Sequence, residues 1–422
     1  MLNKFEGVGE EQMETYISKK KSFSIIFSNK DYVYLSLINV LQGLLSAIIV
    51  PVFPLWVMNE VHVSVSHVFY LLSVIGLGNA VINTFVGSLS DKLGKRKLFF
   101  ELSMCLSIIR NVLYAFFPYI TVIIIASWIT QLSASGITFA ILDDKIKANG
   151  DENHSGIINS IIRGAISVGF ILGPWVGTML ISIMSYRTFF ILYAMCYLLL
   201  LLLIRYLIHD STKITPKKEV IKNKKKESIR IRSVYLTVGV IIFTVLIYAG
   251  IQSINPLLTL YVNERYETWV IGALLGFSVV FEIPFFIIVG KMVDKIGTER
   301  TLYIGIISEI LYFALLSIST NIYVLFALQI LGAFHTVILF ISVMIYIQSL
   351  FEGKTAFSTS MFFSILMVTG TLSNGLIGLV LHSGYSKVFL LFAFCSLGGL
   401  TILLALSSYK RKQSSYLNSS RD

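Results

Sequence analysis

Residues 87–96 read GSLSDKLGKR, and residues 290–300 read GKMVDKIGTER. The two segments share a glycine, an Asp-Lys pair and a second glycine at the same spacing, 203 residues apart. A second match, VMNE at 57–60 and YVNE at 261–264, is separated by 204 residues. Two separate matches at almost one offset indicate that the chain consists of two related halves.

Long apolar runs surround these segments. Of the 422 residues, 55% are hydrophobic and 14% are charged, whereas a soluble domain carries roughly 25% charged residues. Because about 20 apolar residues make a helix long enough to cross a bilayer, the runs predict an all-α integral membrane protein. We predict twelve transmembrane helices, at residues 33–58, 65–89, 98–117, 120–141, 155–182, 186–206, 235–262, 268–290, 301–319, 322–348, 356–381 and 385–409.

The basic residues indicate how these helices are oriented. With the N-terminus in the cytoplasm, 29 of the 34 Lys and Arg residues lie on the cytoplasmic side, as the positive-inside rule requires. The net charge of +11 is therefore a topology signal and does not indicate nucleic-acid binding. Residues 1–31 contain no apolar run of the kind found in a cleavable signal peptide.

The longest hydrophilic segment inside the chain, residues 209–232, separates the two halves. It predicts a flexible cytoplasmic linker that also touches anionic lipid. The predicted organisation is a cytoplasmic tail at 1–31, a six-helix bundle at 32–208, the linker at 209–232, a second six-helix bundle at 233–409 and a cytoplasmic tail at 410–422.

The pattern G-x-x-x-D-K-x-G-K-R resembles the signature loop of the major facilitator superfamily, and its echo in the second half fits this resemblance. The resemblance covers nearly the whole chain beyond residue 31. It implies two pseudo-symmetric bundles around a central site, and a loop that acts as a conformational latch. The latch residues are then Gly87, Asp91, Gly94, Arg96, Gly290, Asp294 and Gly297.

The fifth predicted helix contains Gly169, Gly173, Pro174 and Gly177. Glycines on one face allow another helix to approach closely, and the proline bends the helix. The motif resembles the helix-5 motif of proton-coupled exporters in the superfamily, and the PVFP segment at 51–54 resembles another exporter element. Ordinary helix packing is the alternative explanation.

Within the exporters, the chain is most similar to the bacterial sugar efflux transporter group. The similarity lies in short segments, NEVH at 59–62, SIIR at 160–163, NPL at 255–257 and EIP at 282–284. Many multidrug/proton exporters carry an arginine in helix 4, in the pattern R-x-x-Q-G. Here Trp128 stands three residues before Gln131, which favours sugar over drug efflux without excluding the latter.

Charged groups at mid-membrane are costly and usually have a function and a partner. We predict that Glu282, Arg163 and Arg110 take part in proton coupling, with Glu282 as the proton carrier. A buried Glu–Arg pair that only fixes the helix register is the alternative. Glu309 is expected to face solvent or lipid headgroups.

Several polar side chains are predicted to contact the cargo, since a sugar needs hydrogen-bond donors and acceptors. The repeat places Glu282 opposite Asn79 and Gln131 opposite His335, which suggests a shared cavity. Any single amide is also able to serve as a helix-to-helix bond. The candidates are Asn39, Gln42, Gln131, Asn159, Gln252, Asn255, His335 and Asn374.

The sequence thus predicts a secondary active exporter that extrudes sugars or glycosides in exchange for protons by alternating access. The alternative is a multidrug/proton antiporter for amphipathic drugs. We expect a monomer in the bacterial plasma membrane, both termini cytoplasmic, with no cofactor, metal or nucleic acid. The sequence contains no nucleotide-binding loop, metal cluster or catalytic triad, so we expect no enzymatic activity.

Overall fold

The computed structural model describes residues 27–93, 96–130, 134–151, 154–208, 234–350 and 355–419. Its elements in these ranges are helices. Eleven of them are long and apolar enough to cross a bilayer, and Ile120–Ile129 is a shorter apolar helix. This confirms the predicted all-α membrane fold.

The N-terminal bundle comprises the helices before residue 209. Helix α2 contains Pro51 and Pro54, and both are buried where it packs against its neighbours. The bounds are Lys30–Glu60 for α2, Val65–Leu93 for α3, Arg96–Phe116 for α4, Ile120–Ile129 for α5, Ala134–Asn149 for α6, Ser155–Ile183 for α7 and Tyr186–Leu207 for α8.

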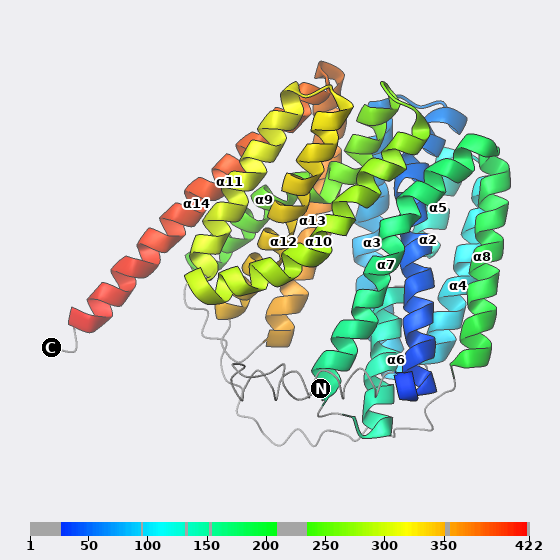
Figure 1. The fold of residues 1–422 in the computed structure, drawn as a ribbon, viewed down its shortest axis with the longest axis horizontal. Coiled ribbons are helices and arrows are strands. Elements are labelled where there is room, and N and C mark those ends of the chain that lie inside the picture. Colours follow the sequence, from blue (N-terminus) through cyan, green and yellow to red (C-terminus); the bar gives the residue numbers. More distant parts are fainter. Residues whose placement is uncertain are drawn as a thin grey trace, which may run out of the picture.

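The C-terminal bundle comprises the helices after residue 233. Its last helix is the longest of the chain, at 35 residues, and runs beyond the rest of the bundle (Figure 1). The bounds are Val234–Asn263 for α9, Thr268–Ile296 for α10, Thr298–Ile318 for α11, Ile322–Leu350 for α12, Thr355–Val380 for α13, Leu381–Ser383 for the short 3-10 helix η2 and Tyr385–Ser419 for α14.

Within the predicted span 120–141, α5 ends at Ile129 and α6 begins at Ala134, and residues 131–133 lie outside the described residues. The hydroxyl of Thr130 donates to the carbonyls of Ala126 and Ser127, and the backbone N–H of Thr130 closes the last turn of α5. Such side-chain bonds compete with the regular helical pattern and favour a helix end.

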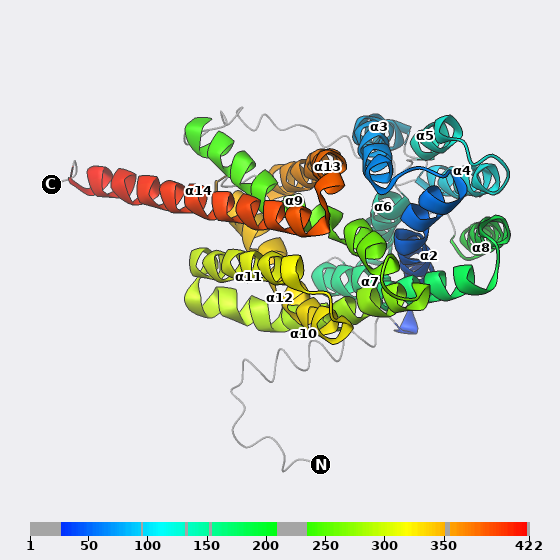
Figure 2. The ribbon, with the colours of Figure 1, turned by 90° about the horizontal axis from the view of Figure 1, so that it is seen from above.

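The two bundles lie side by side, and the helix pairs α3–α13, α7–α10 and α2–α9 form their junction. Seen from above, α3 lies next to α13 and α7 lies next to α10 (Figure 2). We call the membrane face at which α8 ends and α9 begins the linker side, and the other face, where α2 ends and α3 begins, the far side. The bundles are in contact toward the far side and diverge toward the linker side (Figure 1).

Aromatic side chains fill the interior of each bundle. In the N-terminal bundle the Trp56 ring lies 4.9 Å from the Tyr114 ring and 4.7 Å from the Phe190 ring, so that α2, α4 and α8 meet at one point. In the C-terminal bundle Phe362 packs 5.7 Å from Tyr248. These aromatic contacts stabilise each bundle as a unit that can move against the other.

Candidate functional site

The glycines of the helix-5 motif lie on the face of α7 that packs against α2. A Cβ atom added to Gly169 would lie 2.5 Å from the Val40 carbonyl oxygen, and one added to Gly177 would lie 2.5 Å from the Ile48 carbonyl oxygen. Gly173 meets the backbone of α2 between these two points. Because real Cβ contacts are longer, glycine is what allows the two backbones to approach so closely.

Another face of α7 meets α10 of the C-terminal bundle. A Cβ atom on Gly272 would collide with the Thr178 hydroxyl and the Pro174 carbonyl, and one on Gly276 would lie 2.6 Å from the Ile171 carbonyl oxygen. The sequence analysis missed Gly272 and Gly276, although glycines four residues apart are a known signal for close helix pairs. Helix α7 is therefore in close contact with both bundles.

The second junction, between α3 and α13, is also closely packed. The Ser73 hydroxyl donates to the Thr371 carbonyl at 2.8 Å. Gly76 faces the Thr371 side chain, and Gly378 faces the ring of Tyr70. These residues lie in the far-side half of both helices, as do the α7–α10 contacts. The bundles are thus held together at the far side.

Glu282 lies on α10 beyond this contact, in the half that diverges from α7. Its side chain is half-buried, and within the described ranges it has neither a hydrogen bond nor an ion pair. The side chains of Arg163 and Asn159, and the whole of Gln131, lie outside the described residues. Glu282 therefore has the setting expected of a carboxyl group that exchanges protons, and its predicted role stays a prediction.

Arg110 is enclosed within the N-terminal bundle. Its guanidinium lies among the hydroxyl groups of Tyr114, Tyr193 and Tyr197, and is 3.4 Å from the Thr130 hydroxyl. No carboxylate of the described residues pairs with it. The tyrosines replace part of the hydration that this charge loses in the membrane.

The expectation that Glu309 faces solvent or lipid headgroups is wrong. The residue is 0% exposed, in the core of the C-terminal bundle, and both carboxyl oxygens lack a hydrogen-bond partner. Ser396 lies beside it but donates to the Phe392 carbonyl, and the nearby Tyr248 hydroxyl is also without a partner. Helix packing placed this carboxyl inside, and the apolar sequence around it gave no sign of which face was buried.

His335 and Asn79 lie in different bundles. The His335 ring packs 4.9 Å from the Tyr312 ring inside the C-terminal bundle, and its Nδ1 lies 3.0 Å from the Leu331 carbonyl oxygen. Asn79, on α3 of the other bundle, is partly buried and its Oδ1 is without a partner. Their cargo roles are not tested by these contacts.

The amides of α2 point into their own bundle. Asn39 is 0% exposed and donates to the Ile162 carbonyl of α7 at 3.0 Å. Gln42, one turn further, accepts a hydrogen bond of 3.1 Å from the Thr138 hydroxyl of α6. The two side chains share one helical face, as their spacing predicts, and they connect α2 to its neighbours in this conformation.

The amides of the C-terminal bundle differ in their availability. Gln252 donates to the Leu366 carbonyl of α13 at 2.9 Å. Asn255, one turn further along α9, is exposed, and its side chain has no hydrogen bond to the described residues. Asn374 is partly buried with an unpartnered Oδ1. Asn255 and Asn374 thus retain free hydrogen-bonding groups that a cargo is able to use.

The predicted latch contains one ion pair among the described residues. Arg96 Nη1 lies 2.8 Å from Asp144 Oδ1, which joins the start of α4 to the end of α6 at the linker side. In the second copy, Gly297 separates α10 from α11 with φ of +85°, a backbone conformation that favours glycine. The surroundings of Gly87, Asp91 and Gly94 lie outside the described residues.

Gly290 and Asp294 of the second copy are loosely packed. A Cβ atom on Gly290 would meet no atom within 4 Å, and the Asp294 side chain is exposed. Both lie in the diverging half of α10. The latch contacts of Gly290 and Asp294 stay a prediction. Such contacts would form in an arrangement in which the bundles approach each other at the linker side.

Comparisons with known proteins agree with this architecture. Residues 35–372 match the family model of the Major Facilitator Superfamily. The chain is 24% identical to Sugar efflux transporter A of Dickeya chrysanthemi over 359 residues, covering 82% of this chain and 88% of that protein. It is 25% identical to Multi-drug resistance efflux pump PmrA of Streptococcus pneumoniae, covering 63% of this chain and 68% of that protein.

Among solved structures, the fold is similar to that of the nucleoside transporter NupG. The TM-score is 0.75 at 16% identity, and the match covers 89% of this chain and 98% of NupG. This likeness concerns the fold alone. The family match extends over most of the helices described above, and together with their paired bundles it shows that the chain is a non-enzymatic transporter of the Major Facilitator Superfamily.

Proposed function

We propose that this protein exports sugars or glycosides in exchange for protons, by alternating exposure of a site between its two bundles. The observation that carries the proposal is the position of α7. Its exporter-like glycine face packs against α2 while another face packs against Gly272 and Gly276 of α10. A helix in close contact with both bundles is well placed to couple their movement.

We propose that the conformation described here, in which the helices of the two bundles diverge toward the linker side (Figure 1), is open at that side. If both termini and the linker are cytoplasmic, as the distribution of Lys and Arg favours, this is the state that receives cargo from the cytoplasm of a bacterial cell. Reversal of the bundle contacts, from the far side to the linker side, would then release the cargo outside. The Arg96–Asp144 pair, at 2.8 Å, is at the membrane face where such a closure would occur.

Glu282 and Arg163 are proposed to couple proton movement to this cycle. Helices α7 and α10 are antiparallel, and Ile171 faces Gly276 while Pro174 faces Gly272. Continuing this register along both helices brings the backbone of Arg163 to the level of residues 282–284. A carboxyl group can be protonated or paired with a cation, but not both at once. Antiport requires two binding states that exclude each other in this way.

Sugar export is favoured over drug export for two reasons. The sugar efflux relative covers more of this chain than the multidrug relative does, 82% against 63%. The amides of Asn255 and Asn374, whose side chains have no hydrogen bond to the described residues, are neutral donors and acceptors, which suit hydroxyl groups. Multidrug/proton antiport is the second candidate function, because the similar proteins include a multidrug efflux pump.

The proposal is tested by uptake into inverted membrane vesicles that carry an imposed proton gradient. We expect uptake of labelled sugars that stops when the gradient is collapsed, and no competition by amphipathic cations. The variant Glu282→Gln should lose gradient-driven uptake, and the control Glu60→Gln, at an exposed position on the far side, should keep it. Uptake of drugs with no effect of sugars would favour the second candidate instead.

A further inference from the structure

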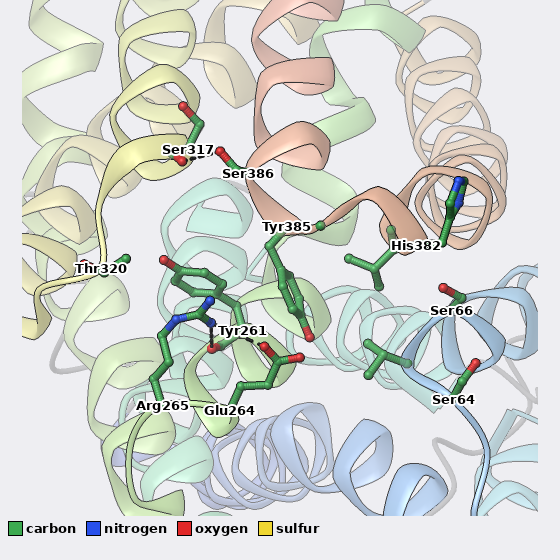
Figure 3. Close-up of a pocket in the computed structure, with 13 residues that line it drawn as sticks. Ser64, Ser66, Tyr261, Glu264, Arg265, Ser317, Thr320, His382, Tyr385 and Ser386 are labelled. Carbon is green, nitrogen blue, oxygen red and sulfur yellow. Dashed lines mark hydrogen bonds and ion pairs between the residues drawn. The ribbon is translucent and has the colours of Figure 1, made fainter.

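A cavity of about 700 Å³ lies at the far side, where the two bundles meet. Residues 64–66, before and at the start of α3, form one wall. The turn after α9 and the segment from η2 into α14 form the others (Figure 3). Its volume is within the range of roughly 300–1,000 Å³ that is typical of small-molecule sites. It is separate from the diverging half of the bundles in which Glu282 lies.

Tyr385 contributes a buried polar group to this cavity. The residue is 8% exposed, and its hydroxyl oxygen is inaccessible and has no hydrogen-bond partner by distance and angle. In Figure 3 the hydroxyl points toward the carboxylate of Glu264. The ring is held in place by Tyr261, 5.3 Å away in an edge-to-face contact. The hydroxyl therefore positions the Glu264 carboxylate at the wall of the cavity, where that carboxylate can accept a hydrogen bond from a ligand.

Arg265 determines which charge a ligand can carry here. Its guanidinium lies 4.2 Å from the centre of the Tyr261 ring, and its Nη1 donates to the Tyr261 carbonyl at 2.9 Å. The same Nη1 is 3.5 Å from Glu264 Oε2. The aromatic face that would attract a cationic drug is therefore already occupied by the protein's own cation. Glu264 and Arg265 also cancel each other's charge, so a charged ligand has no net attraction.

Neutral hydrogen-bonding groups remain available around this pair. Ser66 and Thr320 line the cavity, and their side chains form no hydrogen bond to the described residues. Of the two terminal nitrogens of Arg265, Nη1 is the one with hydrogen bonds to the described residues, and Nη2 also faces this region as a donor. Donors and acceptors thus line the cavity beside a Glu264–Arg265 pair whose charges compensate each other, and such a lining suits a molecule with several hydroxyl groups.

We propose that this cavity is a second binding site, at the far side, for a neutral polyhydroxylated ligand such as a disaccharide. The choice of sugar as ligand rests on the proposed export function, in which cargo leaves at this side. Because residues 64–66 belong to one bundle and Tyr385 to the other, a ligand bound here bridges the bundles in the conformation open toward the linker side.

Thiol labelling of the purified, detergent-solubilised full-length protein tests the proposal without a proton gradient. Cys105, Cys196 and Cys395 are replaced by alanine, and a single cysteine is introduced by Ser66→Cys or, separately, by Thr320→Cys. The control is Ile183→Cys, at a 76% exposed residue at the end of α7 on the same side. Lactose is the neutral probe, and tetraphenylphosphonium is the cationic one.

We expect lactose to slow modification at positions 66 and 320 and to leave position 183 unaffected, with no protection by tetraphenylphosphonium. Tyr385→Phe, which removes only the hydroxyl, should raise the half-protecting lactose concentration about tenfold, equivalent to about 1.4 kcal/mol. Tyr323→Phe, at an 81% exposed ring outside the cavity, should not change that concentration. Lactose-dependent thermal stabilisation supplies a second readout for any variant that labels poorly.

Protection at all three positions alike, protection by tetraphenylphosphonium alone, or no protection by lactose would overturn the proposal. Sugar export by the same protein, measured in vesicles, separates the two ideas. Protection without export would leave the binding site standing and reject the proposed function. Export without protection would support the proposed function and reject the second binding site.

Discussion

Gly276 of α10 lies directly against the backbone of Ile171 in α7, so closely that a Cβ atom would be 2.6 Å from the Ile171 carbonyl oxygen. This contact and the one at Gly272 hold the two bundles together at the far side. A larger side chain at either position has no room to move into, because the neighbouring atoms include the backbone of α7.

Gly276→Ala should therefore disturb the junction. Overpacking a close contact costs typically ~1–3 kcal/mol, enough to shift a two-state equilibrium by about fivefold or more. We expect slower transport at normal expression levels. The matched control is Gly164→Ala on α7, where a Cβ atom meets nothing within 4 Å. Wild-type transport by Gly276→Ala would show that this contact does not control the cycle.

The Arg96–Asp144 pair should affect transport more than stability. Both side chains are about one-third exposed, at 29% and 31%, and pairs near the surface contribute roughly 0–1 kcal/mol to folding. We expect Arg96→Ala and Asp144→Ala each to slow transport with little change in the thermal unfolding temperature. The charge-swapped double variant, Arg96→Asp with Asp144→Arg, should recover part of the rate. If the loss of transport rate in the double variant equalled the sum of the losses in the two single variants, this pair would not form a latch.

Glu309 should tolerate amidation but not a cation. It is fully buried with both oxygens unpartnered, and an unpaired charge is poorly tolerated in such an environment. Glu309→Gln should fold and transport like the wild type, because glutamine has a similar shape and no charge. Glu309→Lys should fail to accumulate. If Glu309→Gln abolished the response to a proton gradient, Glu309 and not Glu282 would be the coupling residue.

Asn39 and Asn255 should separate structural from cargo roles. Asn39 donates to the Ile162 carbonyl in a fully buried site, and losing such a bond costs about 1 kcal/mol. Asn39→Ala should lower the unfolding temperature. Asn255→Ala, at an exposed side chain without a described partner, should leave stability unchanged and raise the apparent KM for cargo. If both variants raised the KM equally and left the unfolding temperature unchanged, Asn39 would belong to the cargo site.

The fold was largely predictable because hydropathy reports membrane crossing directly. The helices differ from prediction mainly where they leave the bilayer. Helix α10 was expected to end at residue 290 and ends at Ile296, and α14 was expected to end at residue 409 and ends at Ser419. Charged residues stop an apolar run without stopping a helix. The last turn of α5 carries hydrogen bonds of the Thr130 hydroxyl that no hydropathy scale contains.

The candidate site was less predictable, since it depends on which face of each helix meets which neighbour. The glycines of α7 were recognised from their spacing, but their partner could have been any helix; the structure assigns it to α2. Glu309 lies in a helix with little amphipathic contrast, so its burial could not be read from the sequence. For the same reason, the spacing of Asn39 and Gln42 predicted that they share one face of the helix, but it did not predict that this face points into the bundle.

The central claim is that the two bundles meet at the far side in one state and must separate there during transport. A disulfide across the α3–α13 junction tests it most directly. A Cβ atom on Gly375 would lie 3.9 Å from the Ser73 Cβ, within the roughly 3.5–4.5 Å that a disulfide requires. We predict that Ser73→Cys/Gly375→Cys, without the three native cysteines, cross-links on oxidation, stops transport, and regains it on reduction. Full transport by the cross-linked protein would contradict the account.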